Sequence, residues 1–127
     1  MSAPTHRLQK EKEVNASTTS IASSPVAGVA VAPISGFVQR VVAAAAGTTS
    51  GTITISVQIN GGSDICGGGL QIAAGSNARA GSVFELNPIG TTNPFVQISE
   101  GDLISWTPSG GTGSAIAGAF GLVIRRA

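Results

Sequence analysis

Apolar and polar side chains alternate strictly in the segment from Thr52 to Asn60. Apolar residues occupy every second position, and Thr, Ser and Gln fill most of the positions between them. A period of two is the pattern of a β-strand that is buried on one face and wet on the other. The segment therefore predicts a central strand whose core face consists of Ile53, Ile55, Val57 and Ile59.

Shorter runs of the same kind fill the rest of the chain after Pro25, and clusters of Gly, Asn, Pro and Ser separate them. Because Gly is abundant, with 18 residues among 127, and the apolar residues are mainly Ala, Val and Ile, strands are favoured over helices. We expect one all-β domain, an antiparallel β-sandwich, over residues 25–127. Its strands are expected at residues 26–31, 37–46, 52–60, 65–66, 69–73, 82–86, 95–98, 103–107 and 115–124.

The core of this sandwich is expected to form around the central strand. Trp106, the single Trp of the chain, is expected to be a core or interface residue, although an exposed Trp would be able to stack on a sugar ring. Further partners of the core face are expected among Phe84, Leu103, Ile104, Phe120 and Leu122.

Residues 1–24 differ from the rest because they are polar and hold a short charged run. Such a segment buries too little apolar surface to fold by itself. We expect an N-terminal arm, extended or partly helical, that contacts a partner. The residues expected to make this contact are Arg7, Leu8, Lys10, Lys12 and Val14.

Groups that could carry catalysis are few. His6 is the only histidine and lies in the expected arm, and Cys66 has no other histidine to activate it. Glu100 and Asp102 are two residues apart, so both carboxylates could bind a cation; alternatively, Asp102 caps its own turn while Glu100 faces solvent. We expect no enzyme, no metal site and no cofactor.

The glycine-rich segments and the charge balance exclude further classes of ligand. Neither Gly67-Gly68-Gly69 nor Gly110–Gly113 is followed by the residues of a phosphate-binding loop, so both are expected to be ordinary loops. After Asn15 four Arg balance four acids, which leaves no basic stripe for nucleic acid. The apolar run near Val26 is too short to cross a membrane, and we expect a product of the cytoplasm.

The order of motifs along residues 36–126 resembles the small jelly-roll domains of phage virions. The motifs that carry this resemblance are the strand ending in Asn60-Gly61, Leu70-Gln71-Ile72-Ala73-Ala74-Gly75, Gly101-Asp102-Leu103-Ile104, the Gly-rich loop at residues 109–114 and the final strand at residues 119–125. The resemblance implies a jelly-roll sandwich that forms homo-oligomers, with a trimer as the expected number.

Charged residues make up only 10% of the chain, which is low for a protein with a fully solvated surface. Together with the resemblance, this predicts a structural virion protein, a capsid decoration or cement protein that binds the major capsid protein and reinforces the shell. The alternative is a head-fibre or tail-fibre tip that binds host-surface glycan. A polysaccharide-degrading enzyme is a third alternative, but so few acids seldom supply its paired carboxylates.

Overall fold

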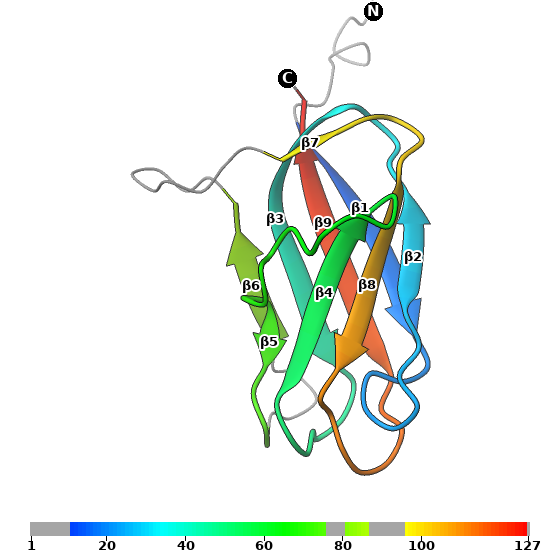
Figure 1. Ribbon diagram of the computed structural model, residues 1–127, viewed down its shortest axis with the longest axis vertical. Coiled ribbons are helices and arrows are strands. Elements are labelled where there is room, and N and C mark those ends of the chain that lie inside the picture. Colours follow the sequence, from blue (N-terminus) through cyan, green and yellow to red (C-terminus); the bar gives the residue numbers. More distant parts are fainter. Residues whose placement is uncertain (1–10, 76–80, 87–95, 127) are drawn as a thin grey trace, which may run out of the picture.

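The chain forms two antiparallel β-sheets that pack face to face (Figure 1). The computed structural model describes residues 11–75, 81–86 and 96–126. Within these ranges every regular element is a strand. The expected antiparallel β-sandwich is confirmed.

The first sheet has five strands. Its hydrogen-bonded order is β1 (Glu11–Thr18), β9 (Gly118–Arg125), β3 (Gly36–Ala45) and β6 (Gly81–Glu85), and β7 (Gln97–Ile98) pairs with one end of β3. β9 therefore lies between β1 and β3, far from both in sequence.

The second sheet has four strands in the order β2 (Gly28–Val31), β8 (Leu103–Ser109), β4 (Ile53–Ile59) and β5 (Gln71–Ile72). Ile65 and Cys66, expected in a strand, lie instead in a turn. Most connections cross from one sheet to the other, so neighbours within a sheet are seldom neighbours along the chain.

The core lies between the sheets and contains the face that the alternation predicts. Ile53, Ile55 and Val57 of β4 are fully buried, as is Trp106 of β8, and Ile59 packs against this core while partly exposed. The rings of Trp106 and Phe120 stack with their centroids 5.9 Å apart and their planes 3° apart. This contact joins the two sheets.

Leu103 does not belong to the core, contrary to one expectation. It is 46% exposed, whereas Ile104 and Trp106 on the same strand are fully buried. Side chains of a strand alternate between its faces, so the inward positions of Ile104 and Trp106 place Leu103 on the outer face.

A β-bulge interrupts the alternation of β3. The pairing with β9 shifts between Val38 and Arg40, which leaves Gln39 as the extra residue. Val38 and Val41 both point into the core as a result, although they are three positions apart, and both are fully buried.

The N-terminal segment is the largest difference from the sequence-based division at residue 24. Residues 11–18 form β1, which pairs with β9 from Glu11 opposite Arg125 to Thr18 opposite Gly118. Ile21, in the connection that follows, is fully buried. The sandwich therefore includes residues that we expected in a partner-contacting arm, because Val14, Ala16 and Thr18 present an inward face to the core.

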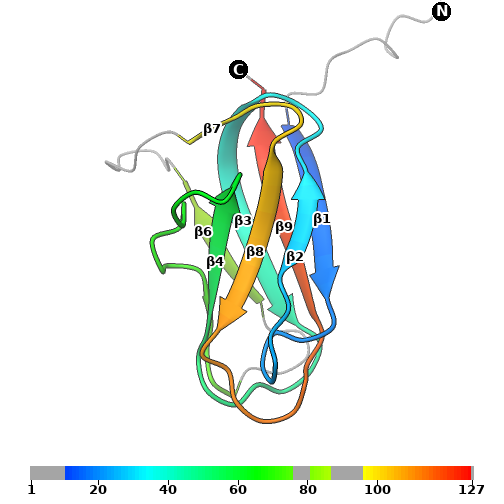
Figure 2. The same cartoon turned by 45° about the vertical axis from the view of Figure 1, so that its right-hand side comes forward.

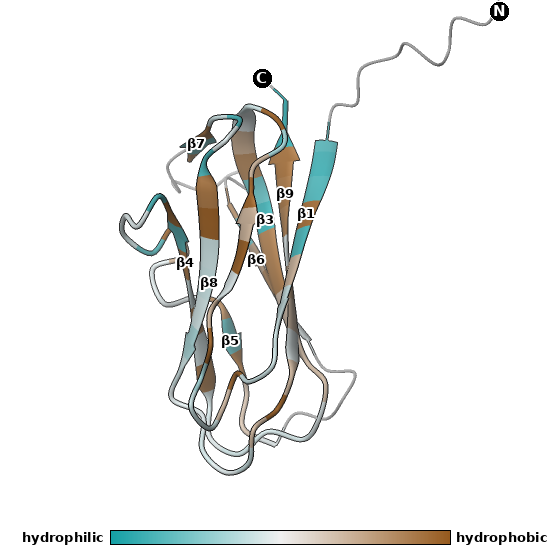
Figure 3. Cartoon of the chain, turned by 90° about the vertical axis from the view of Figure 1, so that its right-hand side faces the viewer, coloured by the Kyte–Doolittle hydropathy of each residue, from teal (hydrophilic) through white to brown (hydrophobic). Residues whose placement is uncertain are grey.

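The place of β1 in the sheet also bears on the residues of this segment that we expected to contact a partner. Val14 is only 7% exposed and is a core residue, so it does not face a partner. Lys12 is exposed on β1, and Arg7, Leu8 and Lys10 lie outside the described residues. Figure 3 shows the charged beginning of β1 as a hydrophilic stretch, in contrast to the hydrophobic β9 beside it.

β1 and β2 belong to different sheets but lie side by side along one side of the sandwich (Figures 1 and 2). The hydroxyl of Thr18 donates a hydrogen bond to the carbonyl oxygen of Val26, in the connection between them. Both sheets thus end in an edge strand at this side.

Candidate functional site

Asp64 organises the loop after β4. Its carboxylate accepts hydrogen bonds from the backbone N–H groups of Val57 at 2.9 Å, Cys66 at 3.0 Å and Gly68 at 2.9 Å. A carboxylate that accepts three backbone donors holds a loop in one conformation. Gly67 and Gly68 have positive φ in this loop, and no helix follows them, as expected for an ordinary loop.

Cys66 lies in the same loop and is buried. Burial raises the pKa of its thiol to about 12, and the nearby negative charge of Asp64 adds to the rise. Since the thiolate is the nucleophilic form of cysteine, the thiol of Cys66 stays protonated and unreactive at neutral pH.

Asp102 caps its own turn, and the alternative of a shared cation site with Glu100 finds no support in the geometry. One carboxylate oxygen of Asp102 accepts the backbone N–H of Ser99 at 2.9 Å, and the other accepts the side-chain amide of Asn60 at 3.0 Å. Glu100 is exposed, and its backbone N–H donates to the hydroxyl of Ser35. The hydrogen bond from the backbone of Ser99 lowers the pKa of Asp102 most, and the hydrogen bond from Asn60 lowers it further.

The described residues form neither a metal-ligand cluster nor a membrane-spanning helix. In residues 11–75, 81–86 and 96–126, no three His, Cys, Asp or Glu side chains gather as a metal-ligand group. The described part of the chain also holds no helix with the length and apolar character that a membrane span needs. Trp106 is fully buried, so it does not offer a stacking surface to a sugar.

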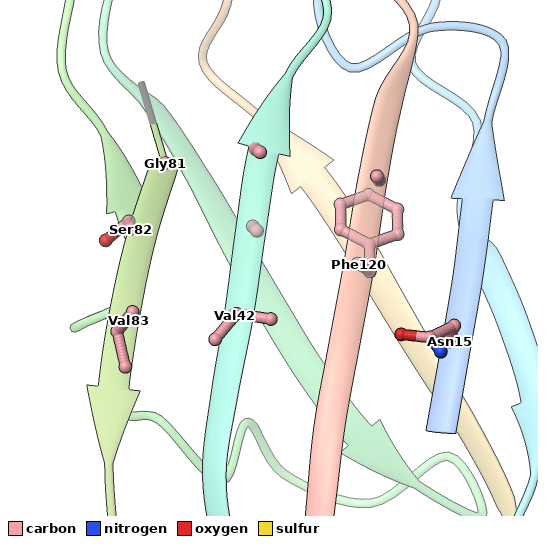
Figure 4. A pocket seen from close by; sticks show the side chains of 9 residues that line it. Asn15, Val42, Gly81, Ser82, Val83 and Phe120 are labelled. Atoms are coloured by element: carbon pink, nitrogen blue, oxygen red, sulfur yellow. The ribbon is translucent and has the colours of Figure 1, made fainter. Parts of the chain in front are cut away.

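The outer face of the five-stranded sheet carries a shallow hollow of about 280 Å³. Figure 4 shows it from close by, with Asn15 from β1, Val42 from β3 and Val83 from β6 around it. Its outward-facing positions hold small or apolar side chains and one amide, and none carries a charge. We call this surface the sheet hollow; it is lined on the outer face by Asn15, Val42, Ala44, Gly81, Val83 and Ala119.

Gly121 of β9 pairs with two residues that line the sheet hollow, Asn15 and Val42. A Cβ atom at this position would lie 2.8 Å from Cγ2 of Val42 and 3.3 Å from Oδ1 of Asn15. The missing side chain therefore lets both neighbours lean over β9. Val83, in contrast, is 59% exposed and projects from the sheet.

A row of charged side chains borders the sheet hollow on one side. Glu13 lies opposite Val123 in the pairing of β1 with β9, and Arg40 of β3 lies opposite both Val123 and Glu85. An apolar centre without charges, surrounded by a polar rim, is usual in protein–protein interfaces. Sequence reasoning missed this surface, although the run of apolar residues at 41–46 signals a strand that is apolar on both faces.

Polar, uncharged side chains cover most of the outer face of the four-stranded sheet. The outward positions of β4 and, apart from Leu103, of β8 hold Thr, Ser and Gln. The side-chain oxygen of Gln58 accepts hydrogen bonds from Ser105 and Thr107. At the β2 edge this polar surface gives way to exposed apolar side chains. These are Val29, Val31 and Leu103.

Comparison with protein-family models, with curated proteins and with solved structures finds no match to this chain.

Proposed function

We propose that this chain is a structural protein that attaches in many copies to a larger shell, and specifically a decoration or cement protein of a phage capsid. The sheet hollow carries the structural part of the proposal: an uncharged surface on a rigid sheet, bordered by Glu13, Arg40 and Glu85. The low content of charged residues supports the same conclusion, since a largely covered surface needs few charges.

The phage capsid is the shell that the sequence resemblance favours. The strand order of the two sheets, β1-β9-β3-β6 and β2-β8-β4-β5, supports the jelly-roll assignment that is part of this proposal. On the capsid, the sheet hollow would receive an apolar projection of the major capsid protein, and the bordering charges would fix its orientation. Many such contacts, each modest, hold a shell against internal pressure because they act together.

The test measures binding of the purified chain to capsids prepared without it. In Val83→Lys a charge replaces an exposed valine at the sheet hollow. We expect at least a tenfold loss of affinity, because the free-energy cost of burying an unpaired charge exceeds the roughly 1.4 kcal/mol that corresponds to a tenfold change in affinity.

The matched control is Gln71→Lys. Gln71 is also exposed and also lies on a strand, but it belongs to the other sheet, at the edge opposite β2. We expect this variant to bind capsids like the unchanged chain. Equal binding by both variants, or no binding by the unchanged chain, contradicts the proposal.

A further inference from the structure

The free edge of β2 lacks the charged side chains that β1 and β6 carry, and β2 is longer than β5, which has no charge either. β1 begins with Glu11, Lys12 and Glu13, β6 ends in Glu85, and β5 is only two residues long. Charges and short length are the usual protection of an edge strand against pairing with another chain. β2, with the sequence Gly-Val-Ala-Val, has neither a charge nor a polar side chain.

The hydrogen bonds of the neighbouring strand β8 show which backbone groups of β2 point to the free edge. The backbone N–H of Asn60 donates to the carbonyl of Leu103 at 2.8 Å, so the backbone groups of Leu103 point toward β4. The N–H and C=O of one strand residue point to the same side. Leu103 lies opposite Val31, and the backbone groups of Val31 therefore point away from β8; by the same alternation, so do those of Val29.

The side chains of these two residues are exposed on the outer face. Val29 is 58% and Val31 59% exposed, beside the exposed Leu103. Ala30, between them, turns its backbone groups toward β8 and packs against the core. The edge thus presents two sets of unpaired backbone donors and acceptors and, next to them, an apolar strip.

We infer that β2 pairs antiparallel with β2 of a second copy of this chain, with Ala30 on the two-fold axis. In this register Val29 lies opposite Val31 of the second copy, and Val31 lies opposite Val29 of the second copy. Both residues have their backbone groups at the edge, so four hydrogen bonds form between the copies. The apolar strips of Val29, Val31 and Leu103 then join into one surface across the axis.

The hydrogen-bonding register of the edge and its lack of charge both fit a second copy of the chain as the occupant. A two-fold axis brings each residue close to its own counterpart, so a charge near the axis would face the same charge. Residues 25–33 hold no charged side chain, and neither do Leu103 and Ser105, which pair with Val31 and Val29. The edge is electrically compatible with itself.

Two prolines limit the pairing to this short segment. Pro25 and Pro33 lie on either side of β2, and proline lacks the backbone donor that a longer ladder requires. Pairing over so few residues buries less than the roughly 1,200 Å² of a standard interface, so the isolated pair is weak. Copies held close together on a shell gain from it because their local concentration is high.

This pairing goes beyond the proposed attachment to a shell and does not depend on it. Pairing of one edge with itself closes after two copies, so this contact is separate from the trimer that the resemblance implies, which stays a prediction.

The first experiment measures self-association of the full chain by sedimentation at increasing concentration, without capsids. We expect a reversible dimer, at least tenfold weaker in Val31→Lys and unchanged in Val83→Lys. A chain that stays monomeric at the highest concentration, or an oligomer that Val31→Lys does not weaken, overturns the inference. Failure of capsid binding leaves this result unaffected, so the two proposals fail separately.

The second experiment tests the register with disulfides. Cα atoms of a directly opposed, hydrogen-bonded pair lie about 5.5 Å apart, within the range of a disulfide. Mild oxidation of a mixture of Val29→Cys and Val31→Cys should therefore give mixed dimers. Each variant alone should give far fewer, and the buried thiol of Cys66, with its raised pKa of about 12, does not compete. Two results contradict the register: a dimer yield from either variant alone that equals the yield from the mixture, or no dimer in the mixture.

Discussion

Trp106 and Phe120 stack in parallel, with ring centroids 5.9 Å apart, and join β8 of one sheet to β9 of the other. Both are buried, and Gly28 lies so close that a Cβ atom there would come within 2.8 Å of the Phe120 ring. The two rings fill the space between the sheets at this level.

Replacing Phe120 with Ala removes half of this contact and leaves a cavity. We expect a loss of about 3–5 kcal/mol in the free energy of unfolding, as is usual for buried aromatic residues. Val83→Ala, at an exposed position, should change it by less than about 0.5 kcal/mol. Denaturant unfolding of both variants measures the difference, and equal stabilities would mean that the stack does not support the fold.

Asp64 is expected to stabilise the loop at residues 63–69 through its three backbone hydrogen bonds. Asp64→Ala leaves those N–H groups without their acceptor, which should lower the free energy of unfolding by about 1–3 kcal/mol. The control is Glu100→Ala, because Glu100 is an exposed acid. Thermal unfolding distinguishes the two variants. An Asp64→Ala variant with unchanged stability would show that water fully replaces the carboxylate as the acceptor of these hydrogen bonds.

The pH dependence of stability should reveal Asp102. The hydrogen bonds from Ser99 and Asn60 lower its pKa in the folded chain below the ordinary 3.8. A lowered folded-state pKa means that the stabilisation is complete above the unfolded-state pKa and disappears as the pH falls through the folded-state pKa.

The measurement is the difference in melting temperature between the unchanged chain and Asp102→Asn as the pH is lowered. We expect a constant difference from neutral pH down to about 4, and a shrinking one below the ordinary pKa of 3.8. Glu100→Gln, measured in the same way, serves as the control. A difference for Asp102→Asn that grows on acidification would contradict the assignment.

Truncation at the N-terminus tests the place of β1. Removing residues 1–24 deletes β1 and the buried Ile21, and it exposes the long edge of β9. We expect this variant to lose its cooperative unfolding transition. Removing residues 1–10 deletes none of these contacts, so that variant should remain folded. If both variants unfold alike, β1 is not an integral strand of the sheet.

The sequence predicts most of the fold because its strands are short, alternating and separated by Gly-rich turns. The face of β4 formed by Ile53, Ile55 and Val57 is the clearest case. β1 escapes this reasoning because its inward face consists of Val14, Ala16 and Thr18, which give only a weak apolar signal beside three charged residues. Its partner β9 supplies most of the apolar surface of that pair.

Two other features depend on pairing that the sequence does not show. The alternation of Phe37, Gln39 and Val41 continues without a break in the sequence, so the bulge at Gln39 appears only in the register with β9. The sheet hollow brings together β1, β3, β6 and β9, whose residues lie far apart along the chain. Three of its lining residues, Gly81, Ala44 and Ala119, are small. They form a hollow only because their strands are neighbours in the sheet.

The number of copies of this chain in purified, intact phage particles tests the proposed function most directly. Quantitative mass spectrometry would give its ratio to the major capsid protein. The proposal predicts on the order of hundreds of copies per particle, because identical capsid subunits present the same surface many times. A handful of copies, as in a fibre, or none at all would contradict it.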